Sequence, residues 1–237
     1  MQKIIKLFPV ISENPDLAAI YAVFIMIAAS AVLFVIYYAI CAKKEKQRTM
    51  GLRRRAEERG LMFEEKSEIP AGAVYNEFFR KGHSRNVSNL VRSVKAGKHS
   101  FSVFDYSYVT GSGRSRQVHL YACAFSKLSR SSGKFFPVFS MIPENFFHKV
   151  ADKITHSDVD FEFYPHFSDK YHLTGPSKEK IELFFKPALL SCLESHLGLE
   201  IYSDGENIAI CRSGHLKLEE ISAFEDECSE IIQILSM

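Results

Sequence analysis

The stretch from Phe101 to Phe125 reads FSVFDYSYVTGSGRSRQVHLYACAF, and it decides the fold class. Bulky and small or polar side chains alternate in FSVFDYSYV, which is the period of a β-strand. GSGR is typical of a turn, and the alternation resumes in QVHLYACAF. The two runs therefore predict a long antiparallel β-hairpin. The alternation shifts at Phe104-Asp105, which predicts a β-bulge at that point.

Further strands are expected on both sides of this hairpin. Glycines divide residues 66–98 into what we expect to be short pieces. Residues 135–141 predict a strand, and Pro137 favours a position at the sheet edge because proline cannot donate a ladder hydrogen bond. Residues 158–164 alternate like a strand, and residues 199–211 read as a second hairpin.

Helices are expected mainly in the C-terminal half. We predict a short helix over 143–154, then a helix that Ser177 caps. Pro187 interrupts this second helix, so we expect either a kink or two short helices that end at Gly198. The closing helix presents apolar residues at helical spacing: Ile221, Phe224, Cys228, Ile231 and Leu235. Strands joined by hairpins, with helices later, favour an α+β domain on an antiparallel sheet.

A long apolar run precedes this domain. No Asp, Glu, Lys, Arg or His occurs from Leu17 to Ala42, and a membrane-spanning helix needs about 20 such residues. Tyr21, Tyr37 and Tyr38 lie near its ends, where membrane proteins carry aromatic belts. A buried core helix rarely lacks charge on every face, and the apolar part of a signal peptide is shorter. The run therefore predicts an uncleaved membrane anchor.

Cations concentrate immediately after this run. They include Lys43, Lys44, Lys46, Arg48, Arg53, Arg54 and Arg55. Because basic residues stay on the cytoplasmic side, we expect the N-terminus outside and the C-terminal domain in the cytosol. In the simpler interpretation, this basic stretch is only an orientation signal. In the other interpretation, it also binds anionic lipid head groups.

The expected organisation has four parts. Residues 1–16 form a short extracytoplasmic N-terminus, and 17–42 form the single transmembrane helix. Residues 43–60 form a basic helical stalk, and 61–237 form the cytosolic α+β domain. The chain carries 30 basic and 28 acidic side chains. Without a basic footprint in residues 61–237, nucleic-acid binding is not expected. The five cysteines include no C-x-x-C pair, and we expect no cofactor.

Two carboxylates are candidate polar site residues. Asp105 interrupts an aromatic strand, where aspartate is disfavoured, and Glu144 stands at the start of a predicted helix. Each also has a structural interpretation: Asp105 satisfies backbone donors in a bulge, and Glu144 stabilises a helix N-terminus. We further expect Phe101, Val103 and Tyr106 to bury against the closing helix.

Histidines gather in the middle of the chain. His148, His156, His166 and His172 are interleaved with aspartates. A metal site needs several such groups to converge, and His166 and His172 flank a predicted loop. We expect these to be surface or loop histidines without a bound metal ion, and a metal site is the alternative.

Four motifs occur in a distinctive order: FDYSY at 104–108, PVFSMIPE at 137–144, DVDF at 158–161 and FSDKYHLTG at 167–175. This order resembles a group of uncharacterised bacterial membrane-anchored proteins that share a domain of unknown function. The resemblance implies N-terminal spans, a basic stalk, a soluble domain and a bacterial inner-membrane location. It assigns no catalytic residue.

No catalytic fingerprint accompanies the anchor. G-x-x-x-x-G-K-[ST], H-E-x-x-H and G-x-S-x-G do not occur. We therefore expect a non-enzymatic interaction or accessory module that meets the lipid bilayer and a protein partner at the inner membrane. The alternatives are an enzyme of unrecognised type that uses Asp105, Glu144 or the His148–His172 region, and a metal or pH sensor.

Overall fold

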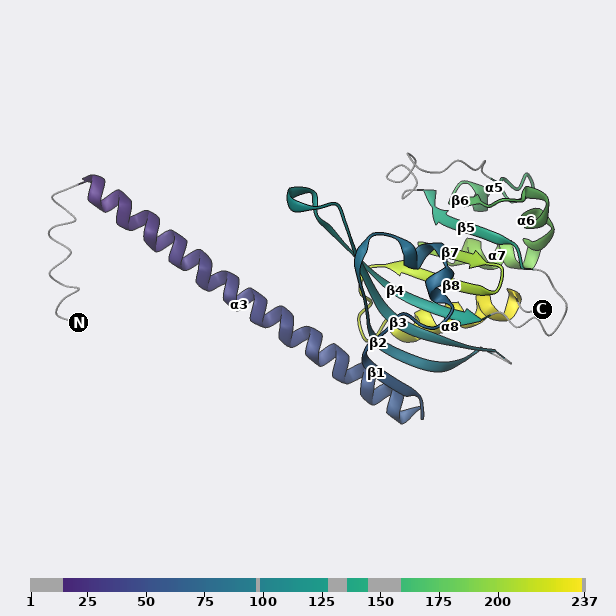
Figure 1. Ribbon diagram of the computed structural model, residues 1–237, viewed down its shortest axis with the longest axis horizontal. Helices are drawn as coiled ribbons and strands as arrows, with labels where there is room; N and C mark the ends of the chain where they lie inside the picture. Colours follow the sequence, from purple (N-terminus) through teal and green to yellow (C-terminus); the bar gives the residue numbers. More distant parts are fainter. Residues whose placement is uncertain (1–14, 97–98, 128–135, 145–158, 236–237) are drawn as a thin grey trace. The chain divides into compact units, whose positions relative to one another are not determined.

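The computed structural model describes residues 15–96, 99–127, 136–144 and 159–235 (Figure 1). The chain divides into two compact units, Met1–Arg48 and Thr49–Met237. One helix, α3 (Pro15–Glu58), contributes residues to both. Each unit is described by itself below.

The described part of the first unit, residues 15–48, belongs to the apolar helix α3. Among the described residues, one helical stretch, Ala19–Glu58, is long and apolar enough to cross a membrane, with a mean hydropathy of 2.7 in its most apolar window. Its large side chains are exposed all round, including Phe24 and Phe34 at 64% and 69%. A helix that is apolar on every side is typically surrounded by an apolar environment, either a protein core or a membrane.

The second unit is built on an eight-stranded sheet. Its strands are β1 (Met62–Ser67), β2 (His83–Ala96), β3 (His99–Thr110), β4 (Gln117–Lys127), β5 (Val138–Pro143), β6 (Tyr171–Thr174), β7 (Leu199–Asp204) and β8 (Asn207–Ser213). Their order across the sheet is β1-β2-β3-β4-β8-β7-β5-β6, and every neighbouring pair is antiparallel. With its helices, this sheet confirms the α+β class.

The closing helix follows the predicted periodicity, and seven helical segments besides α3 lie among the described residues of the second unit. They are η1 (Ala73–Tyr75), η2 (Glu77–Arg80), η3 (Gly113–Ser115), α5 (Pro165–Ser168), α6 (Lys178–Phe184), α7 (Pro187–Ser195) and α8 (Ile221–Leu235). Ser177 stands at the N-cap position of α6 but its side chain makes no capping hydrogen bond. The interruption at Pro187 gives two short helices, α6 and α7, which was one of the two expected outcomes. All five apolar residues that define the predicted closing helix are buried in α8.

The β3–β4 hairpin is confirmed, but the predicted bulge is in the wrong strand. The β3–β4 register runs without a shift from Ser102↔Phe125 to Thr110↔Gln117. The irregularities lie in β2, where Asn89 and Ser93 have positive φ. Bulges let β2 extend over fourteen residues while it bends, so residues 66–98 are not only short pieces.

Three other expectations need correction or fall outside the described residues. β5 lies between β7 and β6, so it is not an edge strand, and Pro137 precedes it. Residues 159–164 form a loop and a turn instead of a strand. Most of the predicted 143–154 helix lies outside the described residues.

The sheet separates two cores. The helical face is the side on which α7 and α8 pack, together with Leu52 and Ala56 of α3. The tyrosine face is the opposite side, which carries four buried tyrosines and is covered by η2. These tyrosines are Tyr106, Tyr108, Tyr121 and Tyr202. Phe101 and Val103 bury on the helical face as expected, whereas Tyr106 belongs to the tyrosine face because side chains alternate along β3.

Candidate functional site

Asp105 is buried on β3 and serves the sheet. Its carboxylate accepts a hydrogen bond of 2.7 Å from the Asn89 side-chain amide. Asn89 has φ +53° in the irregular part of β2, and asparagine tolerates that conformation better than most residues. The contact therefore fixes the bend of β2 against β3.

Glu144 is distant from Asp105. It directly follows β5, and its backbone N–H donates to the Lys170 carbonyl at 2.9 Å. Strands β4, β8 and β7 lie between β3 and β5. At about 4.8 Å per strand, the two positions are roughly 19 Å apart. The structure therefore does not bring these carboxylates together as an acid–base pair.

The candidate histidines are divided between different environments. His166 is exposed on α5, whereas His172 is buried in β6. Neither belongs to a group of three converging metal donors among the described residues. His148 and His156 lie outside those residues.

The basic stretch has two different halves. Lys43, Lys44 and Lys46 are exposed on the part of α3 that belongs to the first unit. In the second unit, Arg53 pairs with Glu65 at 2.8 Å, and Arg55 contacts the buried Glu225 at 3.3 Å. The later arginines therefore help to fold the domain.

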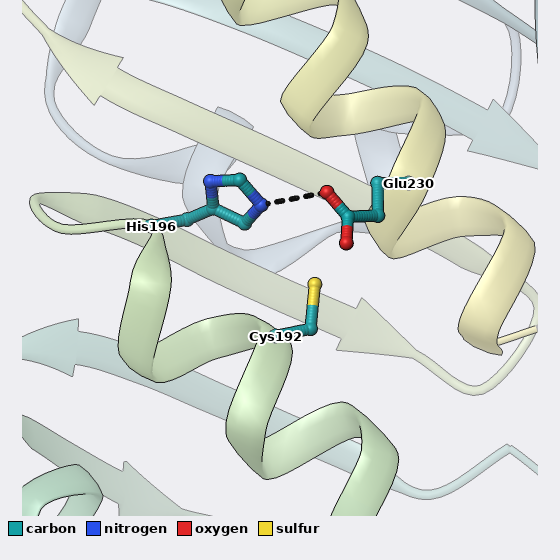
Figure 2. Close-up of side chains that lie close together, drawn as sticks. All are labelled: Cys192, His196 and Glu230. Carbon is teal, nitrogen blue, oxygen red and sulfur yellow. Dashed lines mark hydrogen bonds and ion pairs between the residues drawn. The ribbon is translucent and has the colours of Figure 1, made fainter.

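A cluster of three different metal donors lies between α7 and α8. Cys192 is on α7, His196 follows the last residue of that helix, and Glu230 is on α8. Their donor atoms all lie within 4.8 Å of one another, close enough for one metal ion. Figure 2 shows the His196 ring and the Glu230 carboxylate facing each other, with the Cys192 thiol pointing towards them.

The cluster changes from buried to open across a short distance. Cys192 is 6% exposed, whereas the side chains of His196 and Glu230 are 16% and 56% exposed. His196 Nε2 lies 3.0 Å from Glu230 Oε2. Burial, and then the adjacent Glu230 carboxylate, raises the pKa of the Cys192 thiol to about 12. The thiol therefore stays protonated near neutral pH, and His196 is paired with Glu230 instead of activating it.

Sequence patterns do not reveal this site. Cys192 has apolar neighbours and reads as a core residue, and neither His196 nor Glu230 stands out. The available signal is the Cys-x-x-x-His spacing, which places both side chains on one side of a helix end. Glu230 follows 34 residues after His196, so sequence alone does not connect it to the pair.

A second polar cluster lies on the tyrosine face. Lys81 Nζ donates to the Tyr202 hydroxyl at 2.6 Å, and that hydroxyl donates to Glu200 Oε2 at 2.6 Å. The ammonium also lies over the rings of Phe78 and Tyr202, 5.1 and 4.4 Å from their centroids. Burial raises the pKa of Tyr202 well above its ordinary value. These groups satisfy one another, which is the arrangement of a structural network.

Comparison with known proteins adds no family to this picture. No protein-family model, curated protein or solved structure matches the chain. The assignment of a site therefore depends on the geometry described above.

Proposed function

We propose that this chain is a single-pass membrane-anchored protein whose cytosolic domain is a non-enzymatic interaction or accessory module. The observation that carries this proposal is the continuity of α3. Its N-terminal part is an exposed apolar helix, and its last turns supply Leu52 and Ala56 to the core of the second unit. A helix that is apolar at one end and part of a domain core at the other attaches that domain to a bilayer.

The flanking charges support the orientation. Lys43, Lys44 and Lys46 directly follow the apolar run and are exposed. Lysines in this position keep their side of the helix in the cytoplasm, and they also attract anionic lipid head groups. The proposal therefore places the N-terminus outside and the C-terminal domain in the cytosol. The bacterial inner membrane is the location that the resemblance of the four sequence motifs implies.

A free strand edge supports an interaction role. The register between β4 and β8 begins at Tyr121↔Ser213, so Gln117–His119 has no partner on that side within the described residues. Val118 there is 57% exposed, and Arg114 and Arg116 are exposed at the hairpin tip. An open edge with an apolar side chain accepts an added strand from a partner protein.

Orientation is tested with reporters fused after Met237. A protein that fluoresces only in the cytosol should be bright, while a periplasmic reporter at the same point should be inactive. Changing Lys43, Lys44 and Lys46 to glutamine should produce mixed topology, and changing the exposed Arg54 alone should not. A dark fusion with an active periplasmic reporter would overturn the orientation.

The interaction role is tested with a photo-crosslinking amino acid at Val118 in native membranes. We expect one dominant protein adduct, which should disappear when Gln117 is changed to proline. Phe163, which is 89% exposed in a loop, provides the matched control position. The same adducts at both positions, or none at Val118, would count against partner binding at this edge.

A further inference from the structure

We propose that Cys192, His196 and Glu230 bind one zinc ion, with a fourth coordination position open to water or to a partner's side chain. This inference goes beyond the proposed function and does not depend on it. It also departs from the expectation of no metal, which considered only the histidines of the 148–172 region.

The donor set matches zinc chemistry. Thiolate, imidazole and carboxylate are the three side-chain ligands that Zn²⁺ uses, and softer thiolate ligands disfavour Mg²⁺ and Ca²⁺. Zinc bonds of about 2.0–2.3 Å in a tetrahedron place ligand atoms about 3.3–3.7 Å apart. The three atoms here lie within 4.8 Å of one another, and the imidazole and carboxylate are 3.0 Å apart. Small side-chain rotations are enough to close the site.

The backbone around the site is fixed by neighbouring groups. The buried Tyr171 donates its hydroxyl proton to the carbonyl of His196. Lys170 Nζ donates to the Glu194 carbonyl at 3.2 Å, and Ser195 Oγ donates to the Cys192 carbonyl at 2.6 Å. These contacts hold the end of α7 while α8 presents Glu230. The backbone positions of Cys192 and His196 are therefore held by bonds from outside the site.

The exposure gradient gives the ion an entry path. The Glu230 side chain is 56% exposed, whereas Cys192 is 6% exposed. An ion can therefore enter from solvent at Glu230 and reach the thiol last. A dication that displaces the thiol proton also offsets the electrostatic repulsion between the resulting thiolate and the Glu230 carboxylate. Three protein ligands are one fewer than a closed structural site uses, which leaves the fourth position open.

The simpler alternative is a hydrogen-bonded pair of His196 and Glu230 beside a cysteine that only packs against its neighbours. It predicts that Cys192 makes no contribution to metal binding. The two interpretations therefore differ in whether Cys192 binds the metal ion, and a bond between the thiolate and the metal can be observed spectroscopically.

The test uses the full chain, purified in detergent without an affinity tag and stripped with a chelator. After addition of zinc chloride and removal of the excess, elemental analysis should find about one zinc per chain. Cobalt(II) in place of zinc should give a thiolate-to-metal charge-transfer band that requires Cys192. Zinc should also raise the melting temperature of the parent protein.

Matched variants make the result specific. C192S, H196Q and E230Q should each weaken zinc binding by more than the roughly 10–100-fold that changes around the ligands cause. E230Q alters a half-exposed side chain, so it tests the site without risk to folding. C41S, H166Q and E219Q change exposed residues elsewhere and should bind like the parent. Zinc binding that survives in C192S and E230Q, or a parent protein without zinc, would overturn the proposal.

Discussion

Both faces of the sheet bury apolar side chains, but different kinds of element cover them. On the helical face, regular helices supply the cover, and their apolar residues recur at helical spacing. On the tyrosine face, η2 covers the sheet with two adjacent phenylalanines, Phe78 and Phe79, and a polar network remains among the rings. Helices with periodic apolar residues can therefore be predicted from sequence, whereas a short 3₁₀ segment that buries consecutive residues cannot.

The largest expected difference between the faces is in the cost of removing one central ring. Phe78 is fully buried, with its centroid 4.9 Å from that of Tyr121 and 5.1 Å from that of Tyr202. Phe78→Ala should lower the free energy of unfolding by about 3–5 kcal/mol, towards the upper end because rings anchored on rigid strands cannot collapse into the space. Phe224→Ala on the helical face should fall towards the lower end, because a helix can shift.

Denaturant unfolding of residues 49–237 measures both variants. This fragment begins earlier than the domain expected from sequence because Leu52 and Ala56 belong to its core. If Phe224→Ala is the more costly change, the tyrosine face is the more adaptable one and the comparison is reversed.

The faces also differ in how they hold charge. Lys81 lies 3.8 Å from the buried Glu200, and its own side chain is 27% exposed. Lys81→Met would leave Glu200 without this counter-charge. Breaking a fully buried pair costs about 3–5 kcal/mol, and we expect about 2 kcal/mol here because water reaches the ammonium. Arg80→Met, an exposed neighbour, should change stability by no more than about 0.5 kcal/mol.

Thermal melts of the two variants with the parent provide the measurement. Equal melting temperatures for Lys81→Met and Arg80→Met would show that the network on the tyrosine face contributes nothing to stability. Lys81 would then become a candidate for a role other than folding.

Sequence periodicity predicts the strands and helices in which apolar residues recur at regular spacing. The β3–β4 hairpin, the 199–211 hairpin and α8 were visible because alternation and helical spacing directly report burial. The bulges in β2 were not visible, because positive φ at Asn89 and Ser93 depends on how the strand must bend over two cores. The tyrosine face was also missed, since its cover is too short to have a period.

The candidate site was less predictable than the fold. Asp105 is a candidate because aspartate is unusual in an aromatic strand, and Glu144 because it stands at the start of a predicted helix. The sheet order separates the two residues. The Cys192 cluster combines one short-range pair with a residue from another helix. The cluster forms only because α7 packs against α8, so no local sequence pattern predicts it.

The smallest expected effect concerns the polar pair on the helical face. Asp105 is 3% exposed and accepts its bond from Asn89, so both partners share one strand pair. Asp105→Ala should lower the free energy of unfolding by about 1–2 kcal/mol, because the Asn89 amide then loses a charged acceptor. Asn89→Gly keeps the positive φ and removes the same bond, so it isolates the hydrogen bond from backbone strain.

A double-mutant cycle on residues 49–237 tests this pair. The double variant should cost less than the sum of the two single changes, because both remove one interaction. An Asp105→Ala protein as stable as the parent would contradict the structural role, since residues that serve a site are often held there at some cost to stability. Asp105 would then be a candidate ligand-binding residue. In that case the buried polar group of the helical face would serve function, whereas the Lys81–Tyr202–Glu200 network of the tyrosine face would serve folding.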